Sequence, residues 1–236
     1  NGPNNGYGYN DPGGELTDGV IPAGVGAGYN NWAPYVLWDG KSPTITFDLG
    51  SDRSVTAVSA ISHVDAEGAR NNLRSEGMTG GRLLRFDEMR ARAQKAWDNE
   101  LSSVRVHGGG RDDRVVFYTA LYHALIHPSD IADRDGRVRG PRGKVMQTRS
   151  GHYYSTLSLW DTFRAVHPLL TLIVPERVDG MVQSMLEHHA QQGFLPLWTA
   201  WGRETYCMIG NPALPVIADA VAKGFKGFDH HEALRA

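Results

Sequence analysis

The sequence contains a single cysteine, Cys207, among its 236 residues. One thiol excludes an internal disulfide framework and a zinc cluster built from cysteines. The residues that follow it, Met208 and Ile209, are apolar, and such surroundings favour a buried, unreactive thiol. We therefore expect Cys207 to take no part in chemistry.

An excess of charge and a long apolar run are also missing. The chain has 24 basic and 26 acidic residues, a formal net charge of -2 at pH 7, so it has no basic field that would concentrate nucleic acid or anionic lipid. No uninterrupted apolar run approaches the roughly 20 residues that a membrane span requires. The sequence predicts neither a nucleic-acid partner nor a membrane span.

Several familiar catalytic motifs are absent. There is no Gly-x-Ser-x-Gly elbow, phosphate loop or Rossmann glycine fingerprint. The ten histidines include two adjacent pairs, His188-His189 and His230-His231. Adjacent helical residues point about 100° apart, so neither pair resembles the i, i+4 arrangement that holds a metal. We expect both pairs to be solvated surface histidines.

The order of the patterns predicts an α+β fold. The first 60 residues are rich in turn formers, and the runs 44–49 and 55–58 indicate a hairpin or meander. Apolar spacing of three and four then predicts helices over 86–101, 115–126, 157–173, 175–191 and 212–222. Gly193 and Gly224 suit the ends of the last two. A β-rich start followed only by helices argues for separate layers or domains.

A first candidate binding cluster lies at 152–164, where Trp160, Asp161, Phe163 and Arg164 occur close together. Aromatic faces stack on the C–H side of a pyranose, and carboxylate and guanidinium groups form directional hydrogen bonds to its hydroxyls. The cluster therefore suits a sugar. The alternative is that the aromatic residues are core and that Asp161 pairs with Arg164 or caps a helix.

A second cluster lies at 195–210, where Trp198, Trp201, Arg203 and Glu204 occur as the helical pattern lapses. Loops carry more than their share of binding residues, which favours a functional role. The alternative is that the tryptophans fill a seam between helices and that Glu204 is an ordinary cap.

Long ordered motifs of the chain resemble glycoside hydrolase family 92 from about residue 61 to 224. The resemblance is carried by the segments 117–124, 153–165, 167–172, 175–178, 181–184, 202–210 and 215–220. It implies a secreted, extracellular or periplasmic exo-α-mannosidase that needs calcium, inverts the anomeric centre and removes terminal α-linked mannose from glycans, including N-glycans. It also implies that Trp160 and Asp161 line the terminal-mannose pocket, with Trp201 and Glu204 as further substrate-binding candidates. Arg203 and the pair Asn211-Pro212 depart from the family pattern.

The family resemblance implies an N-terminal β-sandwich packed on an (α/α)6 barrel. Residues 58–82 would end the sandwich, 83–105 would form a linker helix, and 106–236 would form the N-terminal part of the catalytic barrel. Residues 1–57 resemble something else, part of a discoidin (F5/8 type C) jelly roll, a module that often binds sugars. The carriers of that likeness are 12–19, Trp32, Trp38 and 45–50.

The catalytic carboxyl groups expected of the family are missing. An inverting glycosidase needs a general acid and a general base about 6.5 to 9.5 Å apart. The resemblance places the acid in a Glu-Gly motif and the base in an Asn-Glu-Asp-Cys-Gly motif, and neither occurs here. We expect both, and the calcium ligands, beyond Ala236. A non-catalytic carbohydrate-binding protein, or another (α/α)6-barrel glycosidase such as a glucosidase or trehalase-like hydrolase, remains an alternative.

We predict that this chain alone releases no mannose from an α-mannoside, because it lacks the acid and base motifs. A form extended through those motifs should release it. The measurement is mannose released per mole of protein by the two purified forms. Comparable rates from both would contradict the prediction.

Overall fold

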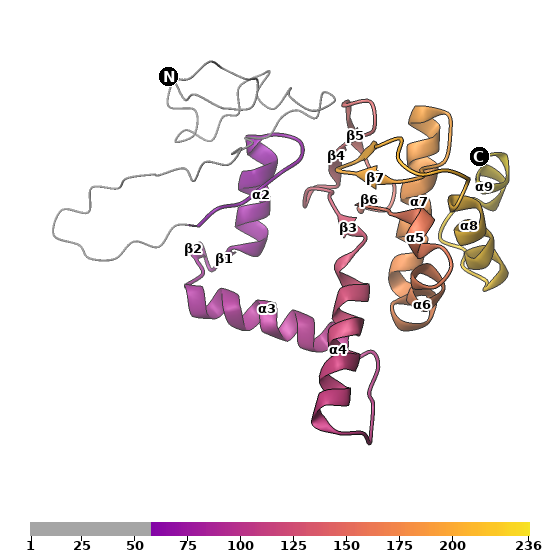
Figure 1. Ribbon diagram of the computed structural model, residues 1–236. Coiled ribbons are helices and arrows are strands. Elements are labelled where there is room, and N and C mark those ends of the chain that lie inside the picture. The colour runs from indigo at the N-terminus through magenta and orange to yellow at the C-terminus, as the bar shows by residue number, and fades with distance from the viewer. Residues whose placement is uncertain (1–57) are drawn as a thin grey trace, which may run out of the picture. The chain divides into compact units, whose positions relative to one another are not determined.

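The computed structural model describes residues 58–236 (Figure 1). The chain divides into two units, Asn1–Val58 and Ser59–Ala236. The expected runs at 44–49 and 55–58 and the discoidin-like segment at 1–57 lie outside the described residues, Val58 apart. In the described part, no helix is long and apolar enough to cross a membrane.

Helices dominate the described residues. They are α2 (Ala66–Glu76), α3 (Phe86–Leu101), α4 (Arg111–Ile126), α5 (Leu159–Thr162), α6 (Val166–Ile173), α7 (Pro175–Gln192), α8 (Ala213–Ala222) and α9 (His230–Arg235). The helices expected from Phe86, Val115, Pro175 and Pro212 are confirmed. Gly193 caps α7 with φ 85°, a conformation that glycine adopts without steric cost.

The single helix expected over 157–173 is wrong, because α5 and α6 are separate. Pro168 is the third residue of α6. Its nitrogen carries no hydrogen for a bond to the carbonyl four residues earlier, so it is tolerated only in a first turn. The chain therefore breaks at 163–165 and starts a new helix.

Short antiparallel strand pairs fill the spaces between helices. β1 (Met78–Thr79) pairs with β2 (Arg82–Leu83), β3 (Ser129–Asp130) with β6 (Tyr154–Ser155), β4 (Arg137–Arg139) with β5 (Val145–Gln147), and β7 (Thr199–Ala200) with β8 (Arg203–Glu204). The expectation that only helices follow the β-rich start is wrong. Strands of two or three residues are too short for an alternating pattern to appear in the sequence. The fold is mixed α and β with small sheets. Where the family resemblance predicted the end of a sandwich, the structure has α2 and the β1–β2 pair.

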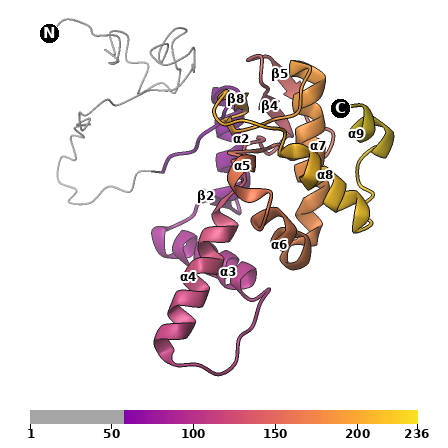
Figure 2. The same cartoon turned by 45° about the vertical axis from the view of Figure 1, so that its right-hand side comes forward.

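Helix α7 is the centre of the packing. Its residues from Met181 to His188 are all buried, and α6 and α8 pack against it (Figures 1 and 2). One apolar cluster joins α7 to α5, α8 and α9 through residues such as Leu159, Leu186 and Ile217. A second joins α7 to α4 and α6. The loop that follows β6 and the loop that precedes α8 are thus both fixed against α7.

This central position overturns the expected exposure of one histidine pair. His188 is only 2% exposed, because other elements pack against α7 in two apolar clusters. Burial, and to a lesser degree His189, lowers the pKa of His188 to about 4. The expectation holds for His230 and His231, which are exposed.

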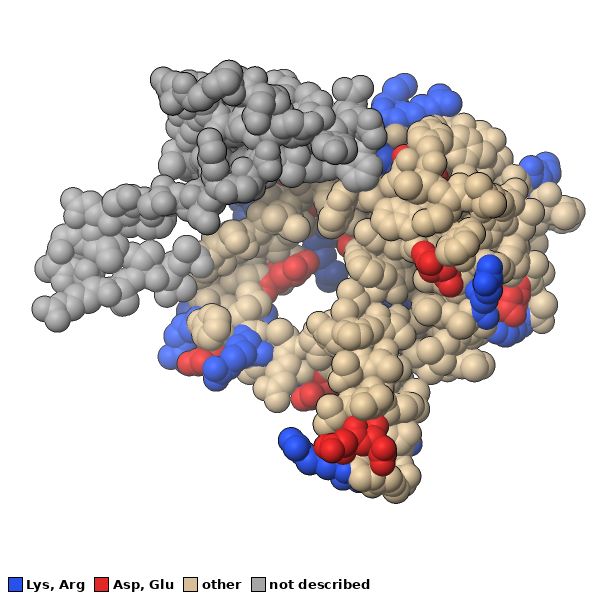
Figure 3. Space-filling view, in the orientation of Figure 1, with Lys and Arg blue, Asp and Glu red and all other residues tan. Residues whose placement is uncertain are grey.

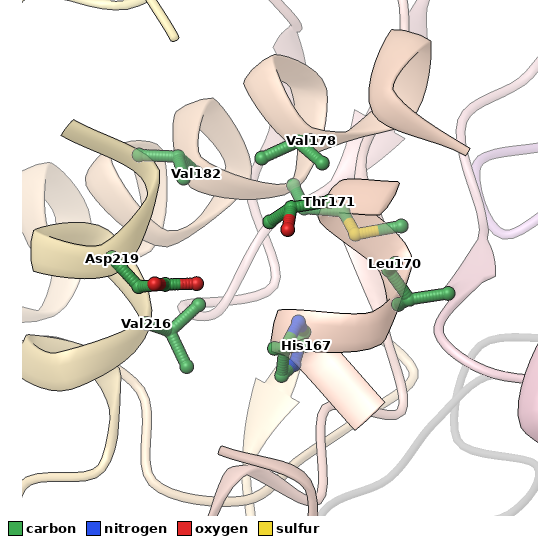
Figure 4. Close-up of a pocket in the computed structure, with 8 residues that line it drawn as sticks. His167, Leu170, Thr171, Val178, Val182, Val216 and Asp219 are labelled. Carbon is green, nitrogen blue, oxygen red and sulfur yellow. The ribbon is translucent and has the colours of Figure 1, made fainter. Parts of the chain in front are cut away.

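His167 of α6 is buried in a similar way. It lies across from Val216 and Asp219 of α8, with Val178 and Val182 of α7 on a further side (Figure 4). The cavity that these residues line has a volume of about 10 Å³, so the ring has little room for solvent. Burial lowers the pKa of His167 to about 4.

Both histidines should make the fold sensitive to mild acid. Their folded pKa of about 4 lies below the ordinary value of 6.5, so the unfolded chain takes up protons first as the pH falls. The contribution of each histidine to the free energy of unfolding is retained above pH 6.5, and it is lost progressively as the pH falls from 6.5 to 4. Between pH 7 and 5 we expect a loss of about 2 kcal/mol per histidine.

The measurement is the free energy of unfolding in urea at pH 7 and pH 5. The double variant His167→Gln, His188→Gln should show a much flatter pH dependence than the unmodified chain. The control His231→Gln changes an exposed ring and should keep the original slope. An unchanged slope in the double variant would contradict the assignment.

Candidate functional site

The structure brings the two aromatic clusters together. Ser158 and Trp198 face each other in an isolated antiparallel bridge. Beside it the Thr199 N–H donates to the Leu157 carbonyl at 3.1 Å, and the Leu157 N–H donates to Thr199 Oγ1 at 3.3 Å. The start of α5 therefore lies against the strand that leads into the β7–β8 hairpin (Figures 1 and 2). Two segments that are far apart in sequence therefore lie side by side.

Trp160 and Asp161 lie on α5 and are open to solvent. Trp160 is 38% exposed, whereas Phe163 is half-buried and packs against the apolar cluster around α7, as the alternative expected of the aromatic residues. The Arg164 guanidinium lies 5.8 Å from the Trp160 ring centroid and 5.0 Å from that of Phe163, a cation–π arrangement. The Ser158 hydroxyl donates to the Asp161 carboxylate. A flat indole and an oriented carboxylate thus stand side by side at the surface.

Glu204 has a different environment. Glu204 is only 5% exposed. Its two carboxylate oxygens accept hydrogen bonds from the backbone N–H groups of Leu197, Trp198, Thr205 and Tyr206 at 2.8 to 3.2 Å. The alternative of an ordinary helix cap is wrong, since these groups belong to a loop and hairpin. The same enclosure argues against direct contact between Glu204 and a sugar. We assign this carboxylate the shaping of the loop.

Trp201 stands at the tip of the β7–β8 hairpin. The register pairs Thr199 with Glu204 and Ala200 with Arg203, leaving a two-residue turn. Trp201 and Gly202 both have positive φ, 50° and 80°, as a type I′ turn requires. This backbone conformation is uncommon for a bulky residue. The turn leaves Trp201 46% exposed.

Gly202 is needed at this turn for a second reason. Its N–H donates to Ser155 Oγ at 2.8 Å, and a Cβ placed on it would lie 2.7 Å from the Arg139 carbonyl oxygen. Real Cβ atoms do not approach backbone oxygen so closely. The hairpin tip is therefore fixed to β4 and β6 at once.

One expectation about a neighbouring residue changes. Cys207 is exposed rather than buried, because Tyr206 and Met208 have positive φ and turn this apolar loop outward.

His63 was not predicted to be near these residues. Its ring stacks on Trp201 with centroids 5.5 Å apart. It lies in the segment that resembles the family, but no pattern in the sequence links it to the hairpin.

A calcium site is not found among residues 58–236. No group of three or more His, Cys, Asp or Glu side chains is arranged to hold a metal there, whereas calcium takes six to eight oxygen ligands. By themselves, the side chains of residues 58–236 therefore do not supply a calcium site. In the view of Figure 3, the surface over α5 to α8 is mainly uncharged, and charged groups gather at the start of α4.

Replacing Glu204 should loosen the loop. In Glu204→Gln the new amide group would face backbone N–H donors, and each unsatisfied buried donor costs roughly 1 to 3 kcal/mol. We expect a loss of about 3 kcal/mol in the free energy of unfolding, with a changed tryptophan emission. The control Glu176→Gln removes a carboxylate that is 66% exposed and should change stability by less than about 0.5 kcal/mol. Equal effects would contradict the assigned role.

Comparisons with known proteins agree on one family. The model described as the glycosyl hydrolase family 92 catalytic domain matches residues 68–236. A family GH92 α-mannosidase from Bacteroides thetaiotaomicron is 38% identical with a TM-score of 0.69, and the match covers 74% of this chain and 23% of that one. Its complex with mannoimidazole matches at 37% identity and a TM-score of 0.68, covering 74% of this chain and 22% of that one.

A family GH92 inverting mannosidase from Bacteroides thetaiotaomicron VPI-5482 is 32% identical with a TM-score of 0.67, over 74% of this chain and 23% of that one. The chain thus spans less than a quarter of the length of these solved relatives. No curated protein matches it. The catalytic-domain match covers well over half of the chain and agrees with the solved structures, so the chain belongs to glycosyl hydrolase family 92.

Proposed function

We propose that the protein is an exo-acting glycoside hydrolase that removes terminal α-linked mannose from glycans. One observation carries the proposal: the pairing of residues 157–158 with 198–199 joins the segment that carries Trp160 and Asp161 to the hairpin that carries Trp201. The solved relatives support mannose as the sugar, since they are α-mannosidases and one holds mannoimidazole. Secretion, the inverting outcome and the calcium requirement are carried over from the family as parts of the proposal.

In this proposal the residues have distinct roles. Asp161, oriented by the Ser158 hydroxyl, accepts hydrogen bonds from hydroxyls of the terminal mannose, and Trp160 stacks on the C–H face of the ring. Arg164 restricts the indole from the side. Glu204 keeps the second loop in place. The general acid, the general base and the calcium ligands would lie outside the residues described here.

The proposed domain limits follow the elements. Residues 58–82 would close a β-sandwich, and 106–236 would supply the first helices of an (α/α)6 barrel, in which α6 and α8 flank α7. Helix α3 has no buried residue, as expected of a linker at 83–105. The separation of Asn1–Val58 as its own unit supports a distinct module for 1–57, which we propose to be discoidin-like.

A carbohydrate-binding protein without turnover is the second candidate. The enclosure of Glu204 favours it. Among the described residues, the clusters at 152–164 and 195–210 contain two carboxylates, Asp161 and Glu204, and Glu204 is already bonded to four backbone N–H groups. Asp161 is then the one carboxylate of these clusters that is open to a ligand. A single open carboxylate can bind a sugar, whereas inverting hydrolysis needs a pair. Turnover separates the two candidates.

The test uses the protein in its natural length with α-mannosides, a β-mannoside and an α-glucoside. We expect turnover of the α-mannosides only. Asp161→Asn should lower kcat/KM on the order of 100-fold, because a charge-assisted hydrogen bond to the sugar is lost. The control Asp87→Asn, on the exposed face of α3, should leave kcat/KM unchanged. Binding of mannose without hydrolysis would favour the second candidate, and turnover of the glucoside would favour another glycosidase.

A further inference from the structure

The segment that precedes α2 is held firmly by one arginine. Arg139 of β4 donates from Nε to the His63 carbonyl at 3.1 Å and from Nη2 to the Val64 carbonyl at 2.6 Å. Its third bond runs from Nη1 to the Gly143 carbonyl at 2.9 Å, in the loop between β4 and β5. The planar guanidinium thus fixes the backbone of His63 relative to β4.

A buried carboxylate holds the same segment from the other side. Asp133 is 3% exposed. It accepts from the Ser62 hydroxyl at 2.6 Å and from Asn72 Nδ2 at 2.9 Å. Ser62 and Val64, the two neighbours of His63 in the chain, are both held by hydrogen bonds. The backbone of His63 is therefore fixed, and its ring can move only by rotation about the side-chain bonds.

The hairpin tip is fixed to the same strand. The carbonyl of Arg139 leaves no room for a side chain at Gly202, and the Arg139 guanidinium holds His63. Arg139 therefore fixes the backbone of His63 through its side chain, and it limits the position of the hairpin tip that carries Trp201 through its carbonyl. Their rings stack with centroids 5.5 Å apart and planes 26° apart. Because Trp201 is still 46% exposed, the indole keeps an open surface beyond the face that His63 covers.

The stacked imidazole is uncharged near neutral pH. Burial lowers the pKa of His63, and the nearby Asp133 opposes that shift only in part. A neutral ring can stack on an indole as a flat aromatic surface. Phenylalanine is then the natural substitute that keeps the stacking and loses the ring nitrogens.

We propose that His63 is a positioning residue that fixes the plane of Trp201, and that the open surface of Trp201 stacks on the sugar next to the terminal mannose. This assignment rests on the proposed function. Trp160 and Asp161 take the terminal residue. Trp201 stands at the tip of a hairpin that leaves the antiparallel Ser158–Trp198 bridge toward Ser155, so it lies farther from α5, where the second sugar of a substrate would be met. An exo-acting enzyme holds the second sugar of its substrate at the rim of its site. The stack is thus a specificity element for the aglycone.

The experiment compares two kinds of substrate in the natural-length protein: methyl α-mannoside, whose aglycone is a methyl group, and the α-linked mannobioses. His63→Ala should lower kcat/KM for at least one mannobiose about tenfold, the amount that an aromatic stacking contact contributes. It should leave kcat/KM for methyl α-mannoside within about twofold. His63→Phe should restore most of the loss, and Trp201→Ala should reproduce it.

A matched control and a fold check complete the design. His107→Ala changes an exposed histidine and should affect neither substrate, and urea unfolding should show that each variant is folded. An equal loss on both substrates, no loss on either, or a failure of His63→Phe to restore the rate would overturn the inference and leave the proposed function standing. Absence of turnover of every α-mannoside by the unmodified protein would instead overturn the proposed function.

Discussion

The site depends on the pairing between the segment that enters α5 and the strand that leads into the β7–β8 hairpin. The bridge between Ser158 and Trp198, with the two hydrogen bonds between Leu157 and Thr199, joins two loops that otherwise have no reason to meet. Both loops rest on α7, the most completely buried helix described. Without this pairing, the segment that carries Trp160 would not be joined to the hairpin that carries Trp201.

Two further constraints give the second loop a single shape. The Glu204 carboxylate gathers four backbone N–H groups from both sides of the hairpin, so it replaces the hydrogen bonds that a longer sheet would provide. Gly202 lets the tip approach the Arg139 carbonyl. A charged side chain is therefore used to build a loop, and the aromatic residue at its tip is left exposed with its direction fixed.

Much of this could be predicted from the sequence, for physical reasons. The period of apolar residues locates α4, α7 and α8, because burying one face of a long helix imposes that period. Helix α3 has the same period although none of its residues is buried in the described part of the chain. Trp160 and Asp161 could be proposed as sugar-binding residues because their chemistry suits a sugar and their motif resembles the family. The break at Pro168 could also have been inferred, since a proline fixes the first turn of a helix.

The remainder depends on contacts that no local pattern records. The burial of His188 follows from what surrounds α7, the two-residue strands are too short to leave an alternation, and the role of Glu204 depends on four N–H groups that carry no side-chain signature. The His63 contact joins the segment before α2 to the hairpin tip, and Arg139 lies against both. Composition supplies the kinds of residue at a site, and the tertiary fold decides which of them face a ligand.

The central claim is that Trp160, Asp161 and Trp201 form one wall of a mannose site. A crystal structure of the natural-length protein with mannoimidazole tests it most directly. The account predicts the inhibitor stacked on Trp160, with a hydroxyl within hydrogen-bond distance of Asp161 and Trp201 at the rim. An inhibitor bound elsewhere, with Trp160 and Asp161 still facing only solvent, would contradict it.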